Sequence, residues 1–458
     1  MKQSIGTLVI LGASGDLSSR LLLPAIGQLL TLHPDRRFRL LGAGMEEWDD
    51  ERWTSVVRKA FEGVEAKGDA IDELLKDTSY IQADVTEKDD LQRIFDACEG
   101  APALYFALPP AVAAKACTAL EAMDRSEGLT LALEKPFGLD ADSAQALNTQ
   151  LLKLVPEERI HRVDHFLGRS TVFNMIGLRF ANSIFEPVWS GEHIDRVDIV
   201  YDETLGLEDR ARYYDGAGAL IDMIQSHLLQ VLAVFAMEPP ATLEAVDFRD
   251  AKAAVLRATR VRGDDPATSS RRARYTAGSV EGKTMPSYAD EQGVDPSRKT
   301  ETLAEVVVEV DTWRWAGVPF TLRSGKALGR RRREVVITFK PARHIPSGLH
   351  GSVEPTRLRI MLAPDEMALE LNINGPGDPY EIDRAALTAE FGPGELLAYA
   401  EVLEGILDGD PTLSVRADTA VQCWRIVEPV IASWKADDVP LEEYAAGSEG
   451  PADWPVTP

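Results

Sequence analysis

The sequence is poor in cysteine, in histidine and in positive charge, and these shortages narrow the possible functions. Three cysteines are present among 458 residues, and their wide spacing forms no metal-binding or disulfide pattern: Cys98, Cys117 and Cys423. The formal net charge of -25 argues against nucleic acid or an anionic membrane as a partner, because both require clustered Lys and Arg. No apolar run reaches the roughly 18 residues of a membrane span. We therefore expect a globular cytoplasmic protein with no metal site.

Strands alternate with helices up to about residue 160. Short β-rich apolar runs occur at 7–11, 38–42, 79–85, 103–110 and 129–138, and helical stretches lie between them, among them 17–30 and 51–75. This alternation is typical of βαβ units in a parallel sheet. The first 160 residues therefore predict an α/β domain.

After residue 160 the β-rich runs follow one another with few helices between them. They occur at 196–203, 300–313, 333–340 and 356–364, and long apolar helices are expected at 219–237, 394–409 and 419–434. Such runs indicate a mainly antiparallel sheet. A chain of this length exceeds the size of most single cores. We predict a larger α+β domain at 161–440, and a flexible tail at 441–458.

A glycine-containing turn joins the first predicted strand to the first helix. Gly12 and Gly15 match the second and third glycines of the dinucleotide-binding fingerprint, whereas Ile10 stands in the first position. Glycine lets the backbone approach a pyrophosphate, and the helix that follows offers free N–H groups. A tight strand-to-helix turn in another α/β protein would carry the same pattern, so this motif alone leaves both interpretations open.

One of only seven histidines stands beside an aspartate in the segment RVDHFLGR, residues 162–169. The functional interpretation is a loop that carries both a catalytic partner, Asp164, and an anion anchor. The alternative is a surface loop with an incidental ion pair, because exposed ion pairs are common and weak.

Taken in order, the motifs resemble the glucose-6-phosphate dehydrogenase family. They are GASGDLSSR (12–20), ALPP (107–110), EKPFG (134–138), RVDHFLGR, RFANSIFEPVW (179–189), YYDGAGALIDMIQSHLLQ (213–230) and PFTLRSGKAL (319–328), and the resemblance extends over residues 7–434. It implies a Rossmann domain followed by the larger domain, assembly into homodimers or homotetramers, and NAD(P)-dependent oxidation of glucose 6-phosphate at C1 to 6-phosphogluconolactone.

The resemblance also implies a role for individual residues. His227 would be the general base that takes the C1 hydroxyl proton, and Asp164 would orient it. The sugar phosphate would be held by Lys135, His165, Arg169, Glu203, Asp222 and Lys326. The dinucleotide would lie against Gly12, Ala13, Ser14, Gly15, Asp16, Leu17, Met45, Glu46, Leu108, Pro109 and Lys135. Alone, each charged residue is typical of a solvated surface. The Lys135–Pro136 bond is expected to be cis.

Several positions depart from the family pattern. Phe166 replaces a tyrosine, Arg169 replaces a lysine, Leu21 stands where a lysine is usual, and Ser226 replaces the asparagine before the base. These changes leave two alternatives open. One is the same chemistry on another sugar, unphosphorylated or with a different anion. The other is a paralogue that binds nucleotide and sugar phosphate without catalysis.

The end of the second predicted strand departs from the pattern in a way that bears on the cofactor. Met45 stands where the family has an arginine for the adenosine 2′-phosphate of NADP, and Glu46 and Glu47 follow it. Acidic groups there suit a free ribose hydroxyl and repel a phosphate. They are also favoured at the start of a helix. We predict a preference for NAD, or use of both cofactors.

Overall fold

The computed structural model describes residues 5–124, 128–168, 170–208, 211–362, 365–375, 377–391, 394 and 396–454. The chain forms two compact units, and each is assembled from separate stretches of sequence. The first unit comprises Met1–Arg169, Pro240–Asp250 and Gly394–Val421. The second comprises Ser170–Pro239, Ala251–Pro393 and Gln422–Pro458. Two short segments from the later sequence therefore return to the first unit.

The first unit contains a seven-stranded sheet in the order β19-β6-β5-β4-β1-β2-β3. Its strands are β1 (Ile5–Leu11), β2 (Arg39–Gly44), β3 (Ser79–Gln82), β4 (Ala101–Phe106), β5 (Thr130–Leu133), β6 (Ile160–Val163) and β19 (Ser414–Val415). The first six are parallel, and β19 joins β6 in antiparallel orientation. The order 3-2-1-4-5-6 is that of the doubly wound Rossmann fold, so the predicted parallel α/β domain is confirmed.

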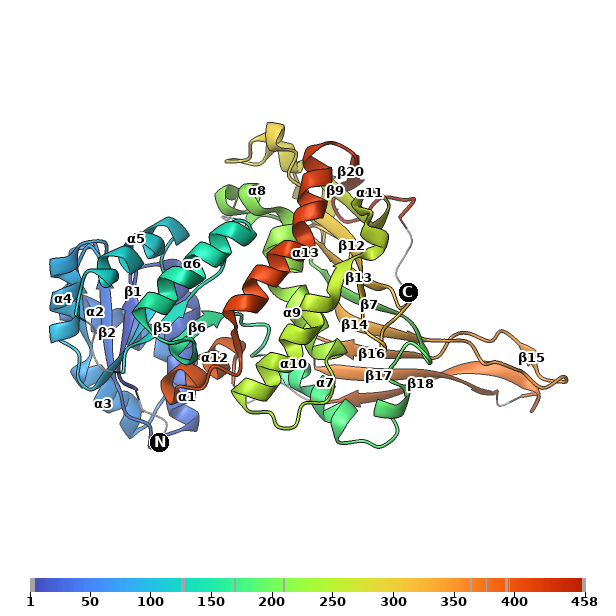
Figure 1. The fold of residues 1–458 in the computed structure, drawn as a ribbon, viewed down its shortest axis with the longest axis horizontal. Helices are drawn as coiled ribbons and strands as arrows, with labels where there is room; N and C mark the ends of the chain where they lie inside the picture. The colour runs from blue at the N-terminus through green and yellow to red at the C-terminus, as the bar shows by residue number, and fades with distance from the viewer. Residues whose placement is uncertain are drawn as a thin grey trace. The chain divides into compact units, whose positions relative to one another are not determined.

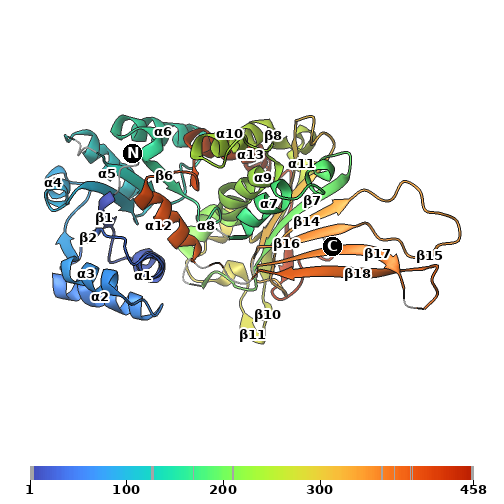
Figure 2. The same ribbon diagram turned by 90° about the horizontal axis from the view of Figure 1, so that it is seen from below.

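Helices cover both faces of this sheet, as Figure 2 shows. Leu8 and Ile10 of β1 pack with α1 (Leu23–Leu32), α2 (Asp50–Glu62), α3 (Asp69–Asp77) and α12 (Ala398–Asp408). Val9 and Leu11 face the opposite way, toward α4 (Lys88–Asp96), α5 (Pro110–Glu121) and α6 (Ala141–Leu154). Alternate residues of a strand point to opposite faces, so one apolar run supplies both cores. Two short helices complete the unit, η1 (Ser18–Leu22) and η2 (Glu157–Arg159).

The single helical stretch predicted over 51–75 is two helices, α2 and α3. Between them Gly68 has φ 129°, a backbone conformation that L side chains rarely adopt. Glu65 has φ 54°, so the chain turns twice before α3 begins.

The second unit contains an 11-stranded sheet that is mainly antiparallel, which confirms the second part of the predicted fold. Its path is β15-β18-β17-β16-β14-β7-β13-β12-β9-β20, and β8 pairs with β12. The strands are β7 (Ile194–Asp202), β8 (Thr259–Val261), β9 (Ser270–Thr276), β12 (Leu303–Val310), β13 (Phe320–Gly325), β14 (Arg332–Phe339), β15 (His350–Gly351), β16 (Arg357–Met361), β17 (Glu366–Asn374), β18 (Glu381–Glu390) and β20 (Leu441–Ala445). A separate hairpin consists of β10 (Gly278–Val280) and β11 (Lys283–Met285).

The helices of the second unit include an apolar succession that packs on strands β12 and β13. It consists of α8 (Ala211–Ala219), the π-helix η5 (Leu220–Leu228) and α9 (Leu229–Ala236). The other helices are α7 (Ser170–Phe180) and α11 (Pro266–Ser269), with short 3-10 turns η3 (Glu186–Val188), η6 (Arg262–Asp264), η7 (Tyr288–Asp290) and η8 (Pro296–Arg298). Helices α10 (Ala245–Ala258) and α13 (Ala417–Lys435) begin in the first unit and continue in the second. Figure 1 shows β17 and β18 extending beyond these helices toward β15.

The run Tyr213–Ala236 is long and apolar enough to cross a membrane by composition, and 89% of its most apolar window is buried inside the protein. Its apolar composition is therefore explained by its position in the core of the second unit.

The predicted flexible tail is wrong over its described part. Strand β20 pairs in parallel with β9, and Tyr444 and Trp454 are buried in a cluster with Tyr275 and Tyr288. The Trp454 indole N–H donates to Glu442 at 2.9 Å. The prediction failed because it relied on the polar composition of the segment, whereas two buried aromatic residues and one strand pairing anchor it.

The buried His161 gives the first unit a predictable sensitivity to acid. It lies on β6, with its Nδ1 3.0 Å from Ser414 Oγ, and burial lowers its pKa to about 3. The unfolded chain has the ordinary value of about 6.5, so the unfolded state binds the proton first and stability is lost as pH falls from 6.5 toward 3. At pH 5 we expect a loss of about 2 kcal/mol from this group, since each pKa unit corresponds to about 1.4 kcal/mol.

Urea unfolding at pH 7 and at pH 5 measures this loss. The His161→Gln variant keeps a neutral polar side chain and serves as the reference. Wild type should lose more stability than the variant between the two pH values. An equal loss in both proteins would contradict the assignment.

Candidate functional site

The predicted site residues are distributed over both units. The first unit carries the dinucleotide set together with Lys135, Asp164 and His165, and the second carries Glu203, Asp222, His227 and Lys326. Arg169 lies outside the described residues. The pairing of Asp164 with His227 joins residues of different units and stays a prediction.

The glycine turn after β1 is closed by its own backbone. The amides of Gly12 and Ala13 both donate to the Ala43 carbonyl, at 2.8 and 3.0 Å, and the Gly15 amide donates to the Gly12 carbonyl at 3.0 Å. Gly12 has φ 86°, and a Cβ at this position would lie 2.3 Å from the Ala107 carbonyl oxygen. Only glycine fits here. The turn lies where β1 has β2 on one side and β4 on the other, the switch point at which doubly wound sheets bind dinucleotides.

Leu108 and Pro109 follow β4 and lie at the same turn. A Cβ on Gly12 would be 2.9 Å from Leu108 Cδ2, so the leucine side chain packs directly against the glycine. Pro109 precedes the first residue of α5. The structure therefore brings these two residues together with the glycine turn.

The acidic residue at the end of β2 is held beside this turn. The Ser14 hydroxyl donates to Glu46 Oε2 at 2.5 Å. Burial, and then the nearby Glu46 carboxylate, raise the pKa of Tyr80 to about 12. Met45 is 70% exposed and offers no charge. The end of β2 thus presents a fixed negative group.

Lys135 follows β5, and its bond to Pro136 is cis as expected. The residue before it, Glu134, accepts a hydrogen bond from the Tyr105 hydroxyl at 2.5 Å and another from Tyr399. Desolvation is the largest influence on the Glu134 carboxyl and raises its pKa. Two phenols therefore hold this carboxyl in the turn that carries Lys135.

Asp164 shapes the loop that follows β6. Its side chain is buried, its Oδ1 accepts the Phe166 amide at 2.9 Å, and its carbonyl accepts the Leu167 amide at 3.1 Å. Phe166, which replaces the family's tyrosine, is buried as well.

The ring of His165 stacks on Tyr399, with centroids 5.2 Å apart and planes 13° from parallel. Tyr399 belongs to α12, more than 200 residues later in the chain. Sequence reasoning missed Tyr399, Tyr105 and Glu134. The only available signal was the position of Glu134 next to Lys135.

Glu203 and Lys326 meet in the second unit because β7 and β13 are parallel neighbours that end in register, with Asp202 opposite Gly325. Lys326 Nζ lies 2.8 Å from Glu203 Oε2. Arg333 binds the other carboxylate oxygen at 3.1 Å. Lys326 also lies over the ring of Tyr214, 5.2 Å from its centroid. Both predicted sugar-binding residues therefore belong to one charged cluster.

Asp222 and His227 are buried on η5. The Tyr213 hydroxyl donates to Asp222 Oδ1 at 3.3 Å. The sequence predicted one regular helix over 219–237, whereas η5 is a π-helix, a conformation found often at functional sites. Ser226, which replaces the family's asparagine, donates to the Ile221 carbonyl at 2.7 Å and so satisfies a backbone acceptor within η5.

Comparisons with known proteins cover the whole of this architecture. Residues 9–174 match the family described as glucose-6-phosphate dehydrogenase, NAD binding domain, and residues 176–455 match its C-terminal domain. The glucose-6-phosphate 1-dehydrogenase of Gluconobacter oxydans is 39% identical over 467 residues, 97% of this chain and 94% of the relative. That of Zymomonas mobilis is 36% identical over 478 residues, 99% of this chain and 97% of the relative.

Solved structures agree with these relatives. The glucose-6-phosphate 1-dehydrogenase of Mycobacterium avium has a TM-score of 0.85 and 32% identity, and the match covers 98% of this chain and 95% of that one. A glucose-6-phosphate dehydrogenase solved with its substrate glucose 6-phosphate has a TM-score of 0.88 and 28% identity, covering 99% and 97%. The chain therefore belongs to the glucose-6-phosphate dehydrogenase family.

Proposed function

We propose that this protein oxidises glucose 6-phosphate at C1 to 6-phosphogluconolactone and passes the hydride to the nicotinamide of NAD or NADP. Residues 1–160 would bind the dinucleotide, and residues 161–440 would bind the sugar. The observation that carries the proposal is the buried pair Asp222 and His227 on η5, in a chain that belongs to this family over its whole length.

The predicted site residues have different roles in this reaction. His227 accepts the C1 hydroxyl proton while the hydride leaves, because a histidine has a pKa near working pH. Asp164 orients the imidazole and stabilises its charged form. Glu203, Asp222, Lys326 and Lys135 hold the sugar hydroxyls. His165 and Arg169 bind the phosphate, which needs convergent charge-assisted donors.

The glycine turn fits a dinucleotide. Gly12 leaves no side chain between the backbone and a pyrophosphate, and a helix begins directly after the turn. Gly12, Ala13, Ser14, Gly15, Asp16 and Leu17 would hold the phosphates. Bound there, the cofactor supplies the hydride acceptor.

The same unit supports a preference for NAD, or the use of both cofactors. The Glu46 carboxylate is held by Ser14, and at the end of the second Rossmann strand an acidic group suits a free ribose 2′-hydroxyl. A 2′-phosphate there would meet a carboxylate instead of the family's arginine, and like charges repel.

We further propose a cytoplasmic homodimer or homotetramer with no nucleic-acid partner. Strands β17 and β18 carry the exposed apolar residues Ile373 and Leu387, and Tyr380 and Phe391 flank β18 and are exposed as well. A second subunit would cover these side chains, because exposed apolar surface favours protein–protein contact. The net charge of -25 opposes binding to nucleic acid.

A spectrophotometric assay of reduced nicotinamide tests the function. Both cofactors are combined with glucose 6-phosphate, glucose and other aldose phosphates. Turnover should be fastest with glucose 6-phosphate. Faster turnover of another sugar would support the same chemistry on a different substrate, and no turnover with any sugar would indicate a binding protein without catalysis.

The base assignment predicts the effect of His227→Asn. Removal of a general base typically lowers the rate about 10²- to 10⁴-fold, so kcat should fall by this factor while the KM for glucose 6-phosphate changes little. Asp164→Asn should also lower kcat, though less. Steady-state kinetics with the His193→Asn variant as control, an exposed histidine of the same unit, gives the comparison. Near-normal turnover of His227→Asn would show that another group is the base.

The cofactor proposal predicts a higher kcat/KM with NAD than with NADP in the wild type. Met45→Arg supplies the missing cation, and the ratio should move toward NADP by about tenfold to a hundredfold, since a charge-assisted contact is worth roughly 1.5–3 kcal/mol and each 1.4 kcal/mol is about tenfold. Met45→Leu adds no charge and should leave the ratio unchanged. A wild-type enzyme that strongly prefers NADP contradicts the proposal and points to Ser14 or Arg20 as the phosphate partner.

A further inference from the structure

The π-helix η5 begins just after a break in the backbone at Gly218. This glycine lies one residue before the end of α8 and has φ 64° and ψ 177°, a backbone conformation with positive φ that favours glycine. The break sets the direction in which η5 leaves α8. Because η5 carries Asp222 and His227, a contact that fixes the backbone at this break also fixes the positions of these two residues.

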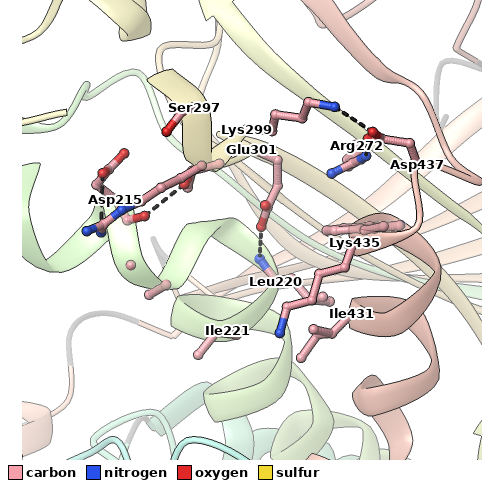
Figure 3. Close-up of a pocket in the computed structure, with 15 residues that line it drawn as sticks. Asp215, Leu220, Ile221, Arg272, Ser297, Lys299, Glu301, Ile431, Lys435 and Asp437 are labelled. Atoms are coloured by element: carbon pink, nitrogen blue, oxygen red, sulfur yellow. Dashed lines mark hydrogen bonds and ion pairs between the residues drawn. The ribbon is translucent and has the colours of Figure 1, made fainter. Parts of the chain in front are cut away.

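A single residue from a distant part of the chain, Glu301, lies at this break. Its Oε1 accepts the Leu220 amide at 2.9 Å, and its backbone carbonyl accepts the Ala219 amide at 3.4 Å. The first amides of a helix have no partner within the helix, so Glu301 satisfies two that would otherwise be unpaired. Figure 3 shows its carboxylate directed at Leu220.

The Glu301 carboxylate also occupies the space that a side chain at position 218 would need. A Cβ at position 218 would lie 2.2 Å from Glu301 Oε1 and 2.7 Å from its Oε2. The glycine is therefore required both by its backbone conformation and by the carboxylate beside it.

The segment that carries Glu301 is fastened to α8 on the other side of the break. The Thr300 hydroxyl donates to the Asp215 carbonyl at 2.8 Å. The Asp215 carboxylate accepts the Tyr288 hydroxyl at 2.8 Å and the Asp295 amide at 3.0 Å. Residues 300 and 301 thus hold the chain before and after the break, and they fix the angle between α8 and η5.

The burial of the Glu301 carboxylate is unfavourable for the stability of the fold. It is 7% exposed, and within the described part of the chain it forms no ion pair. Burial raises its pKa to about 7. The positive charge of Arg272 opposes this rise in the pKa of Glu301, but its guanidinium donates to the Val439 carbonyl and to Asp437. A buried carboxylate without an ion pair is expensive, so a role beyond stability is indicated.

The geometry of η5 makes such a role necessary. A π-helix is less favourable than an α-helix and occurs in short pieces, so its own hydrogen bonds do not determine its start. We propose that Glu301 is a positioning residue of the active site, which fixes the start of η5 and thereby the positions of Asp222 and His227. This inference rests on the proposed function of those two residues.

Substitutions at Glu301 are practical because the side chain is not sealed in the core. It lines a cavity of about 540 Å³ together with Leu220, Arg272, Lys299 and Asp437 (Figure 3). Removal of the carboxylate therefore enlarges an existing cavity. Glu305 on β12 provides a matched control, because it is about equally buried and burial raises the pKa of its carboxyl too.

The test compares Glu301→Ala, Glu301→Gln and Glu305→Gln in the full chain with glucose 6-phosphate. Glu301→Ala should lower kcat about 10²-fold, the size of effect expected when catalytic groups are displaced by about 1 Å, and raise the KM for the sugar while the KM for the cofactor stays unchanged. Glu301→Gln keeps an oxygen acceptor for the Leu220 amide and should recover most of the activity. Glu305→Gln should behave as wild type. A Gln variant as impaired as the Ala variant, or an equal rise in both KM values, overturns the inference.

Hydrogen exchange measured by mass spectrometry supplies a readout without substrate. Residues 219–228 should exchange faster in Glu301→Ala than in wild type and Glu305→Gln. If wild type turns over glucose 6-phosphate and Glu301→Ala equals it, the positioning role fails and the function stands. If wild type turns over no sugar, the function fails, and unchanged exchange in residues 219–228 would reject the fixing of η5 as well.

Discussion

Buried polar groups on an apolar helical run are the constraint around which the second unit is organised. The most apolar window of Tyr213–Ala236 is 89% buried inside the protein, and η5, which belongs to this run, carries Asp222 and His227. Each polar group in such a place needs a partner, because an unpaired one is strongly destabilising. Asp222 accepts from Tyr213, and Gln230 donates to Cys423 Sγ at 3.4 Å. These contacts hold the helix in one register.

The same constraint explains why the helix is irregular. Within η5, Ser226 satisfies the Ile221 carbonyl and the distant Glu301 satisfies the Leu220 amide, and a break at Gly218 precedes both. The π-helix places Asp222 and His227, five residues apart, in a relation that α-helical spacing does not produce, and π-helical turns are frequent at functional sites.

In the first unit, most of the predicted site residues lie just after the carboxyl ends of parallel strands. Gly12 follows β1, Met45 follows β2, Leu108 follows β4, Lys135 follows β5 and Asp164 follows β6. Carboxyl ends of parallel strands lie at one edge of the sheet, so the topology alone gathers these residues. Packing then refines the loops, as the stacking of Tyr399 on His165 shows.

Local sequence predicts the structural features that are determined by residues close together in the chain. Apolar runs of strand length and the glycines at 12 and 15 are enough to predict the parallel sheet and its turn. The break between α2 and α3 was missed because a helical apolar pattern continues across Gly68.

Contacts distant in sequence were not predictable from it. Leu220 and Glu301 are 81 positions apart, and nothing near Glu301 marks it as a partner of a helix. Strand β20 could not be predicted from its own residues, because it forms by pairing with the distant strand β9. Tyr399 likewise reaches His165 only because α12 packs in the first unit.

The most direct test of hydride transfer from C1 uses glucose 6-phosphate that carries deuterium at C1. In the reaction proposed, His227 removes only the hydroxyl proton, and the C1 hydrogen never meets solvent. The reduced cofactor should therefore contain the deuterium, observable by mass spectrometry, and the water should contain none. Reduced cofactor without deuterium, or label found in the solvent, would contradict direct transfer and the role assigned to His227.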